Sequence, residues 1–137
     1  MGRIVALDYG RARTGIAVTD PLGIIAGPLA TVKGAEVIDY LRRYTINEPV
    51  DRIVIGYAKQ MNNQESENMK YVRPFVGELK KAFPEIEMVY YDERFTSVLA
   101  KRAMIDAGAR KKMRKDKSQL DQLSAVIILQ DYLESIR

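Results

Sequence analysis

Residues 3–19 read RIVALDYGRARTGIAVT, two apolar runs joined by a loop that has a glycine at each end. Short β-branched runs separated in this way are typical of paired strands, so the stretch predicts a hairpin. The turn residues 20–23 follow, and residues 24–32 form a third short strand that is interrupted near Gly27-Pro28. The amino-terminal part of the chain is therefore predicted to be an antiparallel meander of three strands.

The hydrophobic period changes after this meander. Apolar residues recur at helical spacing over residues 37–44 and again over 69–83, where Pro84 ends the pattern. The continuous apolar run at residues 52–56 is typical of a strand that is buried on both faces, and residues 86–91 are expected to form a fifth strand. These alternating elements predict an α/β domain with a mixed sheet.

Two further helices are expected in the last third of the chain. Thr96 or Ser97 is placed to cap a helix that ends near Gly108, and Ser118 opens a last helix with apolar positions to Leu133. The whole chain of 137 residues suits one compact domain with one core. We therefore expect a single domain over residues 1–137.

The composition excludes several classes of chemistry. The chain has no cysteine, which excludes a disulfide framework, a thiolate zinc site and a cysteine nucleophile. It has no histidine, which excludes imidazole metal ligands and a Ser-His-Asp triad. Catalysis at neutral pH must then use carboxylates, lysine, tyrosine, hydroxyl groups or a bound metal.

The net charge of +4 is concentrated in one segment. The octet at residues 110–117 reads RKKMRKDK, and without it 16 basic and 17 acidic side chains remain. A charge run is often only a solvated loop, but a local positive patch also indicates a polyanionic partner. We expect the octet to bind a phosphate backbone, with further contacts from the first hairpin. The predicted nucleic-acid-binding residues are Arg11, Arg13, Arg110, Lys111, Lys112, Arg114, Lys115 and Lys117.

No targeting or membrane segment is visible in the sequence. The chain starts MGRIVALDYG, which lacks the apolar core of a signal peptide. No apolar run approaches the roughly 20 residues that cross a bilayer. We expect a cytoplasmic protein without a membrane partner.

Three acidic positions are candidates for the chemistry. Asp8 ends a strand beside the glycine-cornered loop, where it either stays exposed to a ligand or makes an Asx turn. Asp92 and Glu93 end the fifth strand and cannot face the same side while that strand stays extended. Asp121 either closes a capping box with Ser118 or faces the sheet, where an ionised carboxylate needs a partner.

Taken together, these carboxylates indicate a metal site. An oxygen-only ligand set without histidine or cysteine suits Mg²⁺ or Mn²⁺. Two such ions about 4 Å apart hold a phosphodiester and activate water for in-line attack. This chemistry needs no histidine, in agreement with the composition.

Four stretches resemble one known family over nearly the whole chain: IVALDYGRARTGIAVTD, RIVIGYAKQMN, VYYDERFTS and LDQLSAVIILQDYL. Their residues, order and spacing closely resemble the YqgF/RuvX family. The resemblance implies a ribonuclease-H-like three-layer fold, related to the RuvC resolvase, with a five-stranded mixed sheet and helices on both faces. It also implies that Asp8, Glu93 and Asp121 are the catalytic, metal-binding acids, with Glu93 favoured over Asp92.

The resemblance implies a metal-dependent endonuclease that processes the 5′ end of precursor 16S ribosomal RNA, with Mg²⁺ or Mn²⁺ as cofactor. One alternative is a Holliday junction resolvase, which needs two active sites and hence a homodimer. Another is a non-catalytic protein that binds ribosomal RNA or a ribosome-associated partner. The sequence shows no set of residues that would read bases, so it does not decide between an RNA and a DNA substrate. It also leaves open whether the protein is a monomer or a homodimer.

Overall fold

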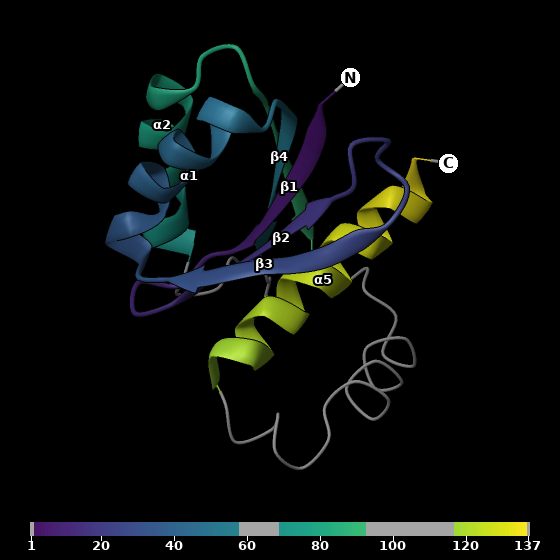
Figure 1. The fold of residues 1–137 in the computed structure, drawn as a ribbon. Helices are drawn as coiled ribbons and strands as arrows, with labels where there is room; N and C mark the ends of the chain where they lie inside the picture. The colour runs from purple at the N-terminus through teal and green to yellow at the C-terminus, as the bar shows by residue number, and fades with distance from the viewer. Residues whose placement is uncertain (1, 58–68, 93–116, 137) are drawn as a thin grey trace.

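The computed structural model describes residues 2–57, 69–92 and 117–136, and of residues 117–120 only the helical backbone. The elements run in the predicted order (Figure 1). They are β1 (Arg3–Asp8), β2 (Thr14–Thr19), β3 (Ala26–Val32), the 3₁₀ turn η1 (Gly34–Glu36), α1 (Val37–Asn47), β4 (Val50–Tyr57), α2 (Met69–Ala82), β5 (Glu87–Asp92) and α5 (Lys117–Ser135). The helix predicted between Thr96 and Gly108 lies outside the described residues.

The five strands form one mixed sheet in the order β3-β2-β1-β4-β5. The first three strands pair antiparallel, and β1, β4 and β5 run parallel. Both the meander and the mixed sheet are confirmed. The pairing of β2 with β3 shifts register between Ile16 and Ala17, opposite the predicted interruption at Gly27-Pro28. An edge strand tolerates this proline because its outer amides need no partner.

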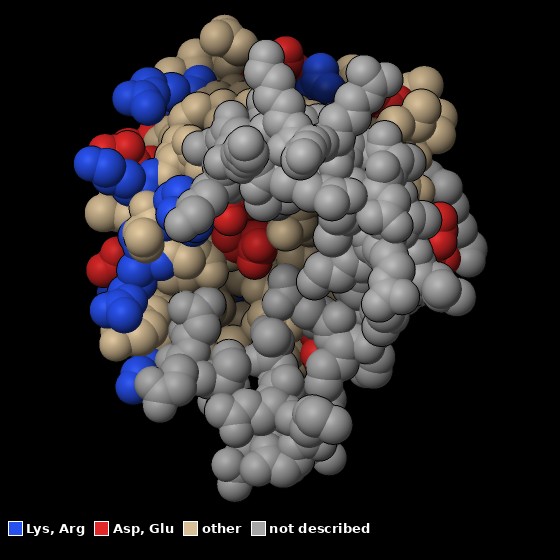
Figure 2. Space-filling model, turned by 90° about the horizontal axis from the view of Figure 1, so that it is seen from below, with Lys and Arg blue, Asp and Glu red and all other residues tan. Residues whose placement is uncertain are grey.

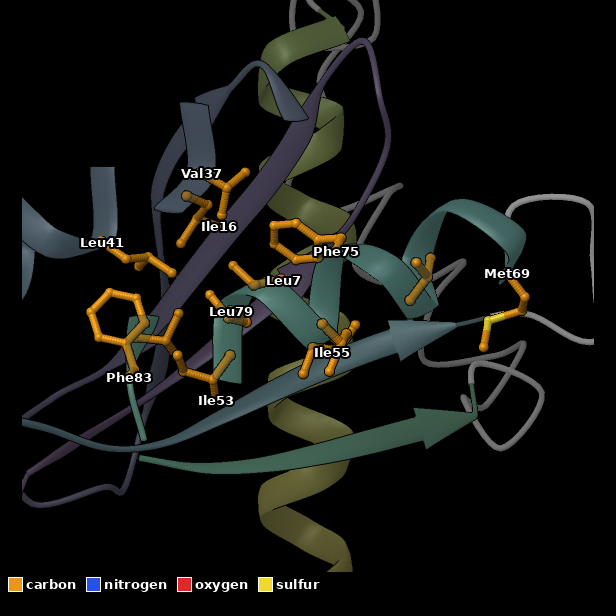
Figure 3. Close-up of a cluster of buried hydrophobic side chains, with 13 residues drawn as sticks. Leu7, Ile16, Val37, Leu41, Ile53, Ile55, Met69, Phe75, Leu79 and Phe83 are labelled. Atoms are coloured by element: carbon orange, nitrogen blue, oxygen red, sulfur yellow. The ribbon is translucent and has the colours of Figure 1, made fainter. Parts of the chain in front are cut away.

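Helices cover both faces of the sheet, which confirms the predicted three layers (Figure 1). Helices α1 and α2 pack on one face, which we call the α1/α2 face, and α5 packs on the other, the α5 face. Large side chains fill the α1/α2 face, including Leu7, Ile16, Ile55, Phe75 and Leu79 (Figure 3). The two hydrophobic clusters follow from the alternation of side chains along each strand.

Smaller residues line the sheet on the α5 face. Ala6 and Ala17 are fully buried there. A Cβ atom on Gly15 would overlap the carbonyl oxygen of Asp121, and one on Gly56 would overlap the side chain of Ile128. The missing side chains therefore let α5 lie directly on the strands.

The ends of the elements differ slightly from the sequence predictions. The fourth strand extends by two residues at its start and one at its end, because it pairs with a neighbour on both sides. The last helix begins at Lys117, one residue before the predicted start. None of the helices in the described part of the chain is long and apolar enough to cross a membrane.

Candidate functional site

Asp8 ends the central strand of the sheet and is half-buried. Its register partners are Gly15 on β2 and Gly56 on β4. Residues paired in register share a face, and Asp8 shares the face of Ala6, which packs under α5. Because both neighbours are glycines, no side chain from an adjacent strand crowds the Asp8 carboxylate on this face.

Asp121 reaches the same end of the sheet from α5. Its carbonyl oxygen lies against Gly15, which is the register partner of Asp8. One glycine therefore touches the backbone that carries each acid, although the two acids lie near opposite ends of the chain. Figure 2 shows acidic side chains together near the centre of the face seen from below, with basic side chains along one side.

The Asp121 carboxylate is paired with Arg13 of the first hairpin. The Arg13 Nε donates to Asp121 Oδ2 at 2.6 Å, and the two side chains are 46% and 23% exposed. The helix begins before Ser118, so that residue is helical and does not take the capping position considered in the sequence analysis. Arg13 is therefore the charged partner of the half-buried Asp121 carboxylate.

Asp92 lies on the other side of the sheet from these two acids. It is only 5% exposed, and its register partner is Tyr57, which packs against the cluster of the α1/α2 face. Glu93 lies outside the described residues. Within the described ranges no group of three acidic, histidine or cysteine residues is close enough to hold a metal. The structure thus brings together Asp8 and Asp121 and separates Asp92 from them.

The two arginines of the first hairpin diverge. Arg13 contacts Asp121 on the α5 face, whereas the exposed Arg11 lies over the ring of Tyr71 in α2, with its guanidinium carbon 3.6 Å from the ring centre. Residues two apart in an irregular loop need not share a face, so the sequence did not reveal this division. The octet residues 110–116 lie outside the described residues, as does the side chain of Lys117, so their binding role stays a prediction.

Aromatic residues near the end of β1 were not identified from the sequence. Tyr9 stacks on Phe75 with ring centres 4.1 Å apart and planes inclined by 18°. Burial raises the pKa of Tyr9, against a lowering by Arg11, so its phenol stays protonated at neutral pH. The alternation of side chains along a strand could have predicted that Tyr9 faces the opposite side of the sheet from Asp8.

Residues 2–135 match the family described as RuvX: Holliday junction resolvase. A protein of Parabacteroides distasonis is 61% identical over 135 residues, covering 98% of this chain and 96% of the relative. A protein of Bacteroides thetaiotaomicron is 58% identical over 137 residues, covering 100% and 99%. Both relatives carry the name "Putative pre-16S rRNA nuclease".

The fold is also similar to a solved structure of RuvC from Thermus thermophilus in complex with a Holliday junction substrate. The TM-score is 0.57 at 15% identity, over 99% of this chain and 96% of RuvC. This likeness supports the ribonuclease-H-like fold. Since the family match spans nearly the whole chain and the relatives are more than half identical, this chain belongs to the RuvX family of nucleases.

Proposed function

We propose that the protein is a metal-dependent endonuclease that cleaves structured RNA, with the 5′ end of precursor 16S ribosomal RNA as its substrate. The observation that carries the proposal is the meeting of Asp8 and Asp121 around Gly15 at the end of β1. The names of the two bacterial relatives support the choice of this RNA.

The donor set at this end fits a hard divalent cation. Asp8 and Asp121 offer only carboxylate oxygens, the ligands that Mg²⁺ and Mn²⁺ prefer. Bound by these oxygens, such an ion supplies Lewis-acid polarisation of a phosphodiester and a water nucleophile at neutral pH. We propose Asp8, Glu93 and Asp121 as its ligands.

The register of β5 supports Glu93 over Asp92 as the third acid. Asp92 pairs with Tyr57 on the α1/α2 face, away from Asp8. In an extended strand the residue that follows faces the opposite side. We therefore propose Glu93, the next residue in the chain, rather than Asp92 as the third acid.

Arg13 has two proposed tasks at this site. Its ion pair holds the Asp121 side chain in place before a cation arrives. With Asp121 holding a cation, the Arg13 guanidinium would be able to bind a substrate phosphate instead. Arginine suits this exchange because its planar fork binds carboxylates and phosphates alike.

We propose that the octet at residues 110–117 holds the substrate backbone. Replacing Lys111 and Lys112 by Glu should raise the apparent KM and reduce the slope of log affinity against log salt by about 2, one per lost phosphate contact. Matched changes at Lys80 and Lys81 of α2 provide the control. If the variant with Glu at both positions cleaves long substrates as the wild type does, the octet is only a solvated loop.

A four-way DNA junction is the second candidate substrate. The description of the matched family and the RuvC fold both favour it. Symmetric resolution of a junction needs two active sites, so this function requires a homodimer on the DNA. Sedimentation that shows only a monomer bound to the junction would count against it.

The test is an incubation of the purified protein with precursor ribosomal RNA and with a synthetic junction. Each substrate is combined with Mg²⁺, Mn²⁺ or EDTA. We expect cleavage of the RNA with either metal and none with EDTA. Cleavage of the junction alone would select the resolvase, and metal-independent binding without cleavage of either substrate would indicate a non-catalytic ribosomal-RNA-binding protein.

A further inference from the structure

A hollow beside Tyr9 on the α1/α2 face has no part in the proposed cleavage. We propose that it binds one nucleotide of the substrate strand, with the base against its aromatic rings and the phosphate at Arg11 and Lys70. This inference rests on the proposed function, because it assumes that the strand crosses the end of β1. The ligand chemistry is that of a nucleotide, and the experiment separates a strand from a free mononucleotide.

The walls of the hollow combine rings and charges. The cavity measures about 260 Å³, and its lining includes Tyr9, Arg11, Lys70, Tyr71, Phe75 and Glu78. Small-molecule sites usually measure about 300–1,000 Å³, so this volume suits a single ring system. Proteins commonly bind single-stranded nucleic acids with aromatic side chains that stack on the bases and cationic side chains that contact the backbone.

The aromatic walls are already ordered by their contacts. Tyr9 stacks on Phe75, which is buried in the core, and Arg11 lies over Tyr71. The Arg11 side chain is exposed and makes no ion pair among the described residues, and a guanidinium is well suited to bind a phosphate. A guanidinium that lies over a ring also offers its own planar surface to a base.

The backbone that carries Arg11 is fixed to the rest of the fold. The Gly34 amide donates to the Arg11 carbonyl at 3.1 Å. The Thr14 hydroxyl donates to the Gly10 carbonyl at 3.0 Å and accepts from the Gly10 amide at 3.2 Å. A Cβ on Gly34 would lie 2.6 Å from the Gly10 carbonyl oxygen, so the hairpin and η1 are in close contact. The hollow therefore needs little ordering when it binds.

The position of the hollow relates it to the acidic site. Tyr9 directly follows Asp8, and the two side chains lie on opposite faces of the sheet at the end of β1. Consecutive Cα atoms are about 3.8 Å apart. A strand that passes around this end can place one phosphate at the carboxylates and a neighbouring base in the hollow.

The charges inside the hollow orient the nucleotide. Arg11 and Lys70 attract a phosphate, whereas the carboxylate of Glu78 repels it and accepts hydrogen bonds from an exocyclic amino group. This arrangement favours bases that carry an amino group. It also predicts that inorganic phosphate alone binds more weakly than a nucleotide.

The test measures binding without cleavage. A fluorescently labelled single-stranded RNA is titrated in EDTA with the wild-type protein and with Tyr71→Ala, Tyr71→Phe and Arg11→Gln. We expect Tyr71→Ala to weaken binding about five- to tenfold, within the range for the loss of one stacked base. Tyr71→Phe keeps the ring and should stay within about twofold of the wild type. Arg11→Gln should reduce the salt slope by about 1.

Tyr90→Ala is the matched control, because Tyr90 is 42% exposed on β5 and outside the hollow. It should bind as the wild type does. Arg11 is exposed, so Arg11→Gln keeps the proposal testable even where Tyr71→Ala fails to fold.

A second titration identifies the source of the nucleotide. AMP, UMP and inorganic phosphate are added while the tyrosine ring signals are followed by NMR. Weaker RNA binding in Tyr71→Ala and Arg11→Gln supports the strand site. If nucleotides shift the tyrosine signals but both variants bind RNA as tightly as the wild type, the assignment to a strand is overturned. If both variants bind RNA as tightly as the wild type and nucleotides cause no shifts, the hollow is not a binding site. Failure of the wild-type protein to bind or cleave any RNA would instead reject the proposed function.

Discussion

The two faces of the sheet differ most at the end where β1 stops. On the α5 face, Gly15 and Gly56 flank Asp8 and let a helix bring Asp121 down onto the strands. On the α1/α2 face, the aromatic residues Tyr9 and Phe75 stack and leave a hollow beside them. The comparison shows that side-chain size decides whether a helix meets the sheet or stands away from it. At this end, the α5 face thereby brings Asp8 and Asp121 together, and the α1/α2 face brings aromatic rings together with Arg11 and Lys70.

Alternation along β1 produces this division from neighbouring residues. Asp8 and Tyr9 follow each other in the chain and face opposite sides. In the loop after them, Arg13 contacts the acidic side and Arg11 the aromatic side. The first hairpin thus supplies the α5 face with an acid and an arginine, and the α1/α2 face with an aromatic ring and an arginine.

The largest effect on stability is expected where the helix touches the sheet. Gly15→Ala places a methyl group against the Asp121 backbone, which cannot move without shifting α5. We expect the free energy of unfolding to fall by about 1–3 kcal/mol, as for other overpacked sites. Chemical denaturation measures this change, and cleavage should fall with it because Asp121 is displaced.

Two other glycines calibrate this prediction. At Gly56 the obstacle is the flexible end of Ile128, so Gly56→Ala should cost less than Gly15→Ala. Gly77 lies in α2 with open space around it, and Gly77→Ala should stabilise the protein by about 0.5–1 kcal/mol. Equal stability of the Gly15 and Gly77 variants would break the contrast between the two faces.

A smaller effect is expected from removing the arginine of the acidic side. Arg13→Gln should change the free energy of unfolding by less than about 1 kcal/mol, because its ion pair with Asp121 is partly exposed. It should also tighten Mn²⁺ binding about fivefold, since about 1 kcal/mol of repulsion between the guanidinium and the incoming cation is lost. Calorimetric titration of Mn²⁺ without nucleic acid measures this affinity.

Arg11→Gln is the control for the metal titration, because Arg11 lies on the aromatic side. It should leave Mn²⁺ affinity unchanged. A gain of similar size in both variants would mean that the two arginines act only through the overall charge, and the division of the hairpin would lose its functional meaning.

The smallest effect is expected at the turn between β2 and β3, which lies toward the start of β1 and so away from the site at its end. Asp20 accepts backbone N–H groups from Leu22, Ile24 and Ile25, and these hydrogen bonds hold its pKa below the ordinary 3.8. A lowered pKa stabilises the folded state above pH 3.8, and this stabilisation is lost as the pH falls through the folded-state value. Thermal unfolding of the wild type and Asp20→Ala should therefore differ at neutral pH and converge in acid.

Cleavage by Asp20→Ala should match that of the wild type at neutral pH, because the turn contacts neither face at the end of β1. A stability difference that stays constant down to the acid range would show that the Asp20 charge plays no part in the turn.

Most of the fold could be predicted because its signals are local. The apolar runs, the glycine-bounded loop and Pro84 each mark an element within a few residues of sequence. The break at Gly27-Pro28 predicted an interrupted third strand for the same reason. Element ends were less certain, since the length of β4 depends on its two neighbours.

The site was only partly predictable because its contacts are long-range. The sequence pointed to Asp8 and Asp121 as candidates but not to Gly15 as the residue that joins them. The pairing of Arg13 with Asp121 likewise joins opposite ends of the chain. The stack of Tyr9 on Phe75 arises only once α2 packs on the sheet, and no spacing in the sequence encodes it.

The most direct test of the acidic site compares three isosteric variants at saturating RNA and Mg²⁺. Asp8→Asn and Asp121→Asn remove a charge on the α5 face, whereas Asp92→Asn removes one on the opposite face. Cleavage should be lost in the first two, with binding kept or improved because one negative charge is gone, and Asp92→Asn should cleave within about twofold of the wild-type rate once folded. Full cleavage by Asp8→Asn, or an equal loss in Asp92→Asn, would contradict the assignment.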